Sequence, residues 1–267
     1  MSRAFLMSAG AVLASALVFA QPPASAPAAD GFHHRFDQIL DVDVRDGLVY
    51  YRTLKSDRSR LDRYVASLNV PAATFQTWTR DQQIAFWLNA YDAFVLETVI
   101  DHYPLRGTIH DIPGAFDKTL RHAAGRALTL DQIENTILPA FKDPRLYLAL
   151  GRGTMGGGRL RSEAYSAEGL EKQLAAVRSE FVTSQHLWHL DAMANQISVT
   201  PIVSWHEQDF VAAYDNPQGP FAARSPVERA ILAFVGPSLL PGEQEFVQKN
   251  TFTIVFGQYD WTLNDLR

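Results

Sequence analysis

The sequence predicts an α+β fold, a predominantly helical single domain with a small, mainly antiparallel sheet. Two observations favour this class. Long segments carry apolar residues at three- and four-residue spacing behind clear helix-capping residues, whereas the strand candidates are short. Helices and strands do not alternate regularly, which argues against a doubly wound sheet. No repeat or second linker interrupts residues 31–267, so this range is predicted to be one globular domain.

Capping residues mark the helix starts. Thr79 and Gln82, like Thr129 and Gln132, have the spacing of a capping box, in which both side chains satisfy backbone amides of the first turn. Ser225-Pro226 adds a proline at the first helical position. The predicted helices lie near residues 31–41, 57–68, 80–102, 130–138, 167–182 and 226–235.

Short runs with alternating or β-branched residues are the strand candidates. They are Leu48–Arg52, Leu146–Leu150, His186–Leu190, Gln196–Thr200 and Thr251–Phe256.

The first thirty residues have the layout of a targeting segment. Arg3 precedes the apolar stretch 4–20, and small residues stand at the cleavage position before Gln21. We therefore expect residues 1–20 to be a signal peptide and 21–30 a Pro/Ala-rich linker. With no cysteine to carry a lipid anchor, the mature protein is expected to be exported, to the periplasm, without stable membrane insertion.

Composition excludes several classes of function. The chain has 24 basic and 29 acidic side chains and a net charge of -5, with no long basic run, so we expect no nucleic-acid binding. It has no cysteine, which excludes disulfides, zinc ribbons, iron–sulfur clusters and a thiol nucleophile. The eight histidines form no His-Glu-x-x-His pattern, so neither a metal site nor another cofactor is predicted.

Two polar residues stand in the otherwise apolar segment 84–100. Asn89 and Asp92 are three residues apart, on one face of the predicted helix. Burying them costs free energy unless both are hydrogen-bonded. They therefore belong either to a structural network in the core or to a functional cleft, in which Asn89 binds a ligand and Asp92 is a candidate general base.

Glycine and arginine are concentrated in residues 151–161. Exposed backbone amides and guanidinium groups together can hold a phosphate or a carboxylate. The alternative is a turn whose arginines pair with acids of the protein itself. The candidate ligand-binding residues here are Arg145, Arg152, Gly156, Gly157, Arg159 and Arg161.

Five segments stand out as motifs: DGLVY (46–50) with Leu54-Lys55, FWLNAYDAF (86–94), LTLDQIENTIL (128–138) leading to Asp143-Pro-Arg145, SWHEQDF (204–210) and YDWTLN (259–264). Together they resemble the domain-of-unknown-function 547 family, over nearly all of the expected mature chain. The resemblance implies a shared cleft framed by Trp205, Tyr259, Asp260 and Asn264, with Asp209 as a second candidate base.

The resemblance implies thiol chemistry in many relatives, which carry a histidine and a Cys-Pro-Pro loop in the region of residues 147–157. Aligning on the shared motifs places Tyr147 at the histidine position and Arg152 and Gly157 at the two cysteine positions. A cysteine mechanism is therefore excluded for this chain.

Three functions remain open. The first is binding of an anionic small molecule or peptide through the Gly/Arg loop beside a buried polar cleft. The second is a hydrolase or transferase that uses a carboxylate, Asp92 or Asp209, as its base. The third is a structural or assembly role with a protein partner.

Overall fold

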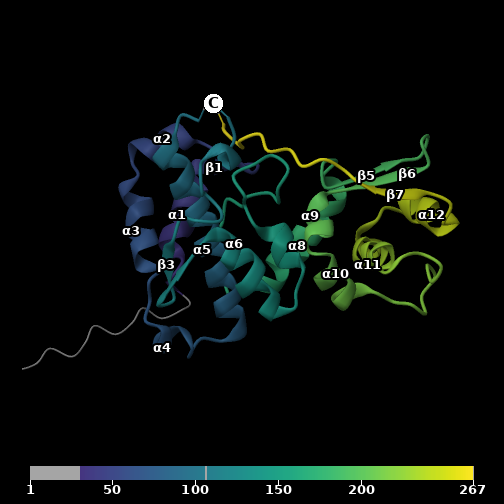
Figure 1. Ribbon diagram of the computed structural model, residues 1–267, viewed down its shortest axis with the longest axis horizontal. Helices are drawn as coiled ribbons and strands as arrows, with labels where there is room; N and C mark the ends of the chain where they lie inside the picture. Colours follow the sequence, from purple (N-terminus) through teal and green to yellow (C-terminus); the bar gives the residue numbers. More distant parts are fainter. Residues whose placement is uncertain (1–30, 106, 267) are drawn as a thin grey trace, which may run out of the picture.

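The structure, a computed structural model, describes residues 31–105 and 107–266 (Figure 1). The predicted signal peptide and linker lie outside this range. The helical segments are α1 (His34–Asp43), α2 (Tyr51–Ser56), α3 (Ser59–Ser67), α4 (Ala72–Phe75), α5 (Arg80–His102), η2 (Ile109–Asp111), α6 (Leu130–Gln132), η3 (Ile133–Ile137), η4 (Leu138–Phe141), α7 (Arg145–Ala149), α8 (Leu170–Thr183), α9 (Pro201–Trp205), α10 (Glu207–Tyr214), α11 (Pro226–Val235), η5 (Gly236–Ser238) and α12 (Pro241–Lys249). The strands are β1 (Val44–Arg45), β2 (Leu48–Val49), β3 (Arg121–Ala123), β4 (Arg126–Leu128), β5 (Trp188–Asp191), β6 (Gln196–Val199) and β7 (Thr253–Phe256).

The α+β prediction is confirmed, and the capping signals placed the main helices well. The Thr79 hydroxyl accepts the Gln82 amide N–H at 3.3 Å, while the Gln82 side chain accepts the Thr79 N–H at 2.8 Å, and α5 begins at the next residue. Ser225 and Thr129 cap α11 and α6 in the same way. Capping satisfies backbone amides that have no partner within the helix, so these starts are fixed locally.

The predicted strand Leu146–Leu150 is wrong, because residues Arg145–Ala149 form helix α7. The helix follows Pro144, and the backbone N–H of its first residue, Arg145, donates to the Asp143 carboxylate at 3.1 Å. The run is buried on every side, so its sequence carries no periodicity that separates a strand from a helix. The candidate Leu48–Arg52 is also shortened, since β2 ends at Val49 and α2 starts at Tyr51.

The strands form small separate sheets. β1 pairs with β2 and β3 with β4, both antiparallel. The remaining sheet has the order β5-β6-β7, in which β5 and β6 are antiparallel and β6 and β7 are parallel, with Ile197 opposite Ile254. The sheet expected to be mainly antiparallel therefore has one parallel edge.

Helix α5 is the centre of the core. Its residues from Ile84 to Ile100 are buried except for Glu97, as expected for a helix that is apolar on all sides. Tyr64 and Phe36 stack 4.7 Å apart on the α1 and α3 side of it. Among residues 31–105 and 107–266, no helix combines the length and the apolar character that a membrane span needs.

The C-terminal segment extends from one end of the molecule to the other (Figure 1). After β7, at one end in Figure 1, the chain runs back across the molecule to β1 and α2 at the other. There the Asn264 side chain accepts the Tyr51 hydroxyl at 2.7 Å and donates to the Gly47 carbonyl at 2.8 Å. On its way the segment contributes Trp261 to the lining of a polar cavity.

Candidate functional site

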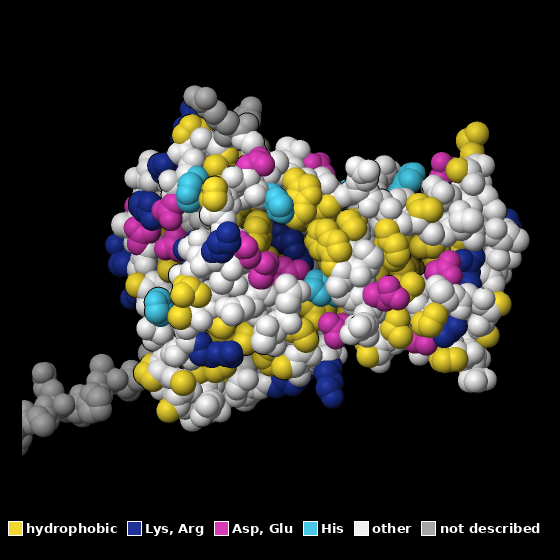
Figure 2. Space-filling view, in the orientation of Figure 1, with side chains coloured by type: hydrophobic (Ala, Val, Ile, Leu, Met, Phe, Trp, Pro, Cys, Tyr) yellow, Lys and Arg dark blue, Asp and Glu magenta, His cyan; other side chains and the backbone are white. Residues whose placement is uncertain are grey.

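A cavity of about 530 Å³ opens near the middle of the face shown in Figure 2, where acidic, histidine and hydrophobic side chains meet. Four parts of the chain line it: residues of α5, α6 and η3, η2 with the loop that follows it, the loop after α7 that carries Arg152, and two later segments that carry the tryptophans. The lining residues are Tyr91, His110, Ile112, Gly114, Ala115, Phe116, Asp117, Asp131, Glu134, Asn135, Arg152, Trp205, His206 and Trp261.

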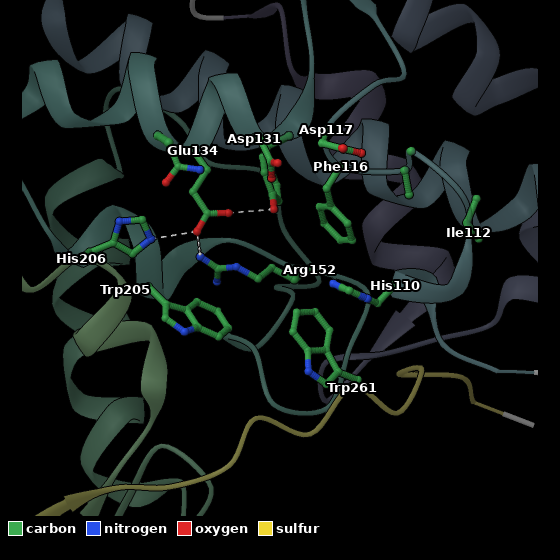
Figure 3. A pocket seen from close by; sticks show the side chains of 14 residues that line it. His110, Ile112, Phe116, Asp117, Asp131, Glu134, Arg152, Trp205, His206 and Trp261 are labelled. Carbon is green, nitrogen blue, oxygen red and sulfur yellow. Dashed lines mark hydrogen bonds and ion pairs between the residues drawn. The ribbon is translucent and has the colours of Figure 1, made fainter.

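Glu134 is the hub of the cavity's polar floor (Figure 3). Its Oε1 accepts Arg152 Nη2 at 2.5 Å and lies 2.9 Å from His206 Nε2, and its Oε2 accepts the Tyr91 hydroxyl at 3.1 Å. Glu134 belongs to η3, a π-helical turn, which is a rare geometry found often at functional sites. Three residues from distant segments therefore hold one buried carboxylate.

Glu134 and Arg152 carry opposite charges at neutral pH. Burial alone would raise the pKa of Glu134, but Arg152 and His206 outweigh it and hold the pKa at about 2. Burial would likewise lower the pKa of Arg152, yet the attraction of Glu134 raises it above its ordinary value. The pair is a buried ion pair, which requires such multiple hydrogen bonding to be tolerated.

A tyrosine packs against the outer face of His206. The rings of Tyr147 and His206 are parallel with centroids 3.6 Å apart, and the Tyr147 hydroxyl donates to Asp209 Oδ2 at 2.6 Å. Arg152 Nη1 also donates to the Tyr147 carbonyl at 2.8 Å. Tyr147 and Arg152, the two positions at which the resemblance implies a histidine and a cysteine in relatives, are therefore in direct contact.

Aromatic rings form the wall opposite the acids. Trp205 is 45% exposed, although it neighbours buried residues, and its ring lies 6.2 Å from that of Trp261 and 5.1 Å from that of Tyr259. The His110 ring lies 4.5 Å from Trp261. Large aromatic faces left open to a cavity are typical of ligand sites.

Two further carboxylates line the cavity. Figure 3 shows Asp117 and Asp131 on one side, the rings of Trp205 and Trp261 on the other, and Arg152 between them. Burial and the nearby Glu134 and Asp117 raise the pKa of Asp131. Among the described residues, neither Asp117 nor Asp131 is paired with an arginine or a lysine.

The polar pair that stood out in the apolar helix lies elsewhere. The Asn89 amide donates to the Tyr165 carbonyl at 2.8 Å and accepts the Tyr165 N–H at 2.9 Å. Asp92 Oδ1 accepts the Gly151 N–H at 2.8 Å, and burial raises the pKa of Asp92 to about 7. Both side chains are satisfied inside the core and neither lines the cavity, which fits the structural interpretation.

The arginines of the predicted anion loop point to different places. Arg152 enters the cavity floor, whereas Arg145 binds Asp143 and Glu171, both at 2.8 Å. Arg159 pairs with Asp46 at 3.0 Å across the surface. Arg161 contacts Glu163 and Glu180, both at 3.2 Å. Each guanidinium group is therefore engaged by an acid of the protein itself.

The glycines of the loop permit close backbone packing. The Gly156 N–H donates to the Asp260 carbonyl at 2.8 Å, and a Cβ at Gly156 would lie 2.5 Å from the Asp260 nitrogen. A Cβ at Gly158 would lie 1.8 Å from the Leu148 oxygen. Gly157 lines a second cavity of about 280 Å³, together with Arg159 and His186.

Of the four residues of the expected family cleft, Trp205 and Asn264 line a cavity, and each lines a different one. Trp205 lines the larger one, and Tyr259 supports it from behind through a 2.6 Å hydrogen bond to Thr154. Asp260 accepts the Thr262 N–H at 2.9 Å, and hydrogen bonds from the Thr262 side chain and backbone lower the pKa of Asp260. Asn264 is buried in its contacts with Tyr51 and Gly47 and lines the smaller cavity.

Sequence reasoning missed the hub of the site. Glu134 stands between Ile133 and Ile137 on the buried face of its segment, and this was the available signal. His206 and Trp261 lie in the SWHEQDF and YDWTLN motifs, from which the sequence predicts only their neighbours Trp205, Asp209, Tyr259, Asp260 and Asn264 as site residues. Their meeting with Glu134 depends on tertiary structure, which no local pattern encodes.

The described residues contain no group of three or more His, Asp or Glu side chains arranged to hold a metal ion. Chemically, the cavity offers a fixed ion pair, a histidine oriented by a carboxylate, two further acids and open aromatic faces. Such a lining can bind and orient an organic molecule through its charge and its aromatic surface.

One family matches the chain. Its description is "Protein of unknown function, DUF547", and it matches residues 75–182, which include the FWLNAYDAF and LTLDQIENTIL motifs. The motifs at 46–55, 204–210 and 259–264 lie outside the matched range. No curated protein and no solved structure shows a significant match to the chain. Residues 75–182, which supply Tyr91, Glu134 and Arg152 to the cavity, therefore belong to the DUF547 family.

Proposed function

We propose that this protein binds a small organic molecule in the cavity between Trp205, Trp261 and the Glu134–Arg152 floor. One observation carries the proposal: a half-exposed tryptophan stands over a buried ion pair in a cavity of about 530 Å³. A cavity of this size, with aromatic walls and a few fixed polar groups, matches the general properties of small-molecule sites. The fixed ion pair would orient the ligand.

Binding is favoured over the other functions that the sequence leaves open. Of the two candidate bases, Asp92 is enclosed in the core, and Asp209, which accepts a hydrogen bond from Tyr147, lines a neighbouring cavity beside Trp205 and not this one. A hydrolase or transferase that uses either base therefore receives no support from the cavity. Export to the periplasm stays a prediction from residues 1–30.

Anion binding by the Gly/Arg loop stays a prediction as well. An anion at Arg145, Arg159 or Arg161 would compete with acids that already contact these arginines. Surface ion pairs are weak, so this competition does not forbid binding. Benzoate and inorganic phosphate belong in the test below for this reason.

The experiment is ligand-observed NMR with soluble probes of one size class: benzyl alcohol, methyl glucoside, choline, benzoate and inorganic phosphate. We expect at least one probe to bind the native protein and to lose at least tenfold in affinity in Trp205→Ala. Trp205 is largely at the surface, so its truncation leaves the core intact.

Phe256→Ala is the matched control, because Phe256 is 40% exposed on β7 and does not line the cavity. The Phe256→Ala variant is expected to bind each probe with the same affinity as the native protein. If no probe binds, or if every bound probe is indifferent to Trp205→Ala, the proposal is wrong. Binding of benzoate or phosphate that is lost in Arg159→Ala but kept in Trp205→Ala would instead favour the anion loop.

A further inference from the structure

Resting on the proposed function, we infer that the ligand of this cavity carries an organic cation, an alkylated ammonium group held between the tryptophan rings and the Asp117 and Asp131 carboxylates. The cavity presents two features that suit such a group and that come from separate parts of the chain. These are aromatic faces on one side and unbalanced negative charge on the other.

The aromatic side forms a partial cage. Trp205 ends α9, Trp261 belongs to the C-terminal segment, and Phe116 belongs to the loop after η2. The planes of Trp205 and Trp261 differ by 22° with centroids 6.2 Å apart, so the two rings present similarly oriented faces. The face of an indole ring is electron-rich and attracts alkylated ammonium ions, and cages of several rings are the usual way in which proteins bind them.

The charged side has a net negative charge, because the two charges of its internal ion pair cancel. Arg152 is the single described cation with a permanent charge in the lining, and Glu134 neutralises it at 2.5 Å. This leaves the carboxylates of Asp117 and Asp131 without a basic partner among the described residues. The lining therefore carries two negative charges in excess when the histidines are neutral.

The surroundings of Asp131 support the same conclusion. Its pKa is raised by burial and by the charges of Glu134 and Asp117, while His110 acts in the opposite direction. A carboxylate in a field of like charge gains most from a bound cation. A neutral ligand would leave this repulsion unchanged, and an anion would increase it.

The test compares choline with its uncharged carbon isostere, 3,3-dimethylbutan-1-ol, on the native protein by isothermal titration calorimetry. The two molecules differ by a nitrogen in place of a carbon, so their shape is held constant. We expect choline to bind at least tenfold more tightly. We also expect its affinity to fall as NaCl is raised from 20 to 300 mM, because charge attraction is screened by salt.

Substitutions then locate the charge. Asp117→Asn and Asp131→Asn together should reduce the preference for choline to less than threefold and leave the affinity for the isostere unchanged. Asp41→Asn is the matched control, because Asp41 is exposed on α1, away from the cavity. Trp205→Ala should weaken both probes, since it removes a face that either one contacts.

The outcomes separate this inference from the proposed function. If both probes bind equally and both are lost in Trp205→Ala, the cavity is a ligand site but not a cation site. The same holds if methyl glucoside or benzoate binds there more tightly than choline. If neither the two probes nor any molecule of the wider set binds, the proposed function fails together with the inference.

Discussion

Asp92 and Glu134 are both carboxylates buried on helical segments, yet their surroundings have opposite effects. Asp92 receives one backbone N–H, and burial raises its pKa to about 7. The Glu134 carboxylate is hydrogen-bonded to an arginine, a tyrosine and a histidine. Despite its burial, the pKa of Glu134 is held at about 2. The first group lies in a closed core, and the second lies at the floor of a cavity.

The comparison teaches that burial alone does not identify a functional acid. A buried carboxylate that keeps its charge requires cations and donors from several segments, and assembling these costs conformational entropy and desolvation. Such an assembly at a cavity suits the binding of a ligand. A carboxylate such as Asp92, which is enclosed in the core, bonded to a backbone N–H and absent from the cavity lining, fits a role in packing.

Arg152→Met should have the largest effect, because it leaves the Glu134 charge buried without its strongest partner. We expect a loss of about 3–5 kcal/mol in the free energy of unfolding, measured by urea denaturation at pH 7. The double variant Arg152→Met/Glu134→Gln should recover most of this loss, since it removes the unpaired charge. If the loss of stability in the double variant equals the sum of the losses in the two single variants, Glu134 and Arg152 are not energetically coupled.

Asp92→Asn should change the pH dependence of stability. The pKa of Asp92 is raised from 3.8 to about 7 in the folded state, so the native state holds a proton that the unfolded state releases. Its contribution is therefore fully present below about pH 4 and is lost as the pH rises to about 7, by on the order of 4 kcal/mol.

In Asp92→Asn this loss should disappear, because the amide oxygen can still accept the Gly151 N–H and does not ionise. Relative to the native protein, the variant should gain stability from pH 4 to pH 8 in urea titrations. A constant difference between the two proteins over this range would show that Asp92 titrates normally. Asp41→Asn, at an exposed position, is the control and should show no such trend.

Asn89→Ala should cost about 2–3 kcal/mol, because it leaves a buried N–H and a buried carbonyl of Tyr165 without their partners. Thermal or urea unfolding measures this loss, with Asn69→Ala at an exposed position as the control. Probe binding by the folded variant should be unchanged, since Asn89 does not line the cavity. If the Asn89→Ala variant is fully folded but no longer binds the probe, Asn89 belongs to the ligand site after all.

Much of the fold could be predicted from sequence because its signals are local. The capping boxes of α5, α6 and α11 are complete within four residues, so they were recognised without tertiary information. The run Leu146–Leu150 was misassigned for the opposite reason, since full burial removes the amphipathic period. The short helices α9 and α10 carry the SWHEQDF motif but show too few turns for a periodic signal.

The site was predicted only in part because its components are joined by long-range contacts. The local composition predicts Arg152 and the resemblance to the family predicts Trp205 as site residues, and both line the cavity. Glu134 was overlooked because an acid in a helical segment is ordinarily exposed. Its role becomes visible only when Arg152 and His206, 18 and 72 residues away in sequence, reach its carboxylate.

Tyr147→Phe should have the smallest effect and tests how far the Glu134 network extends. It removes the hydroxyl that donates to Asp209 but keeps the ring that stacks on His206. Because Asp209 is partly open to solvent, we expect a loss of only about 1 kcal/mol in unfolding by urea. Tyr147→Ala should cost more, since it also removes the stacked face. If Tyr147→Phe instead weakens probe binding by more than threefold, the Asp209 hydrogen bond positions His206, and the functional network extends beyond the cavity to the surface.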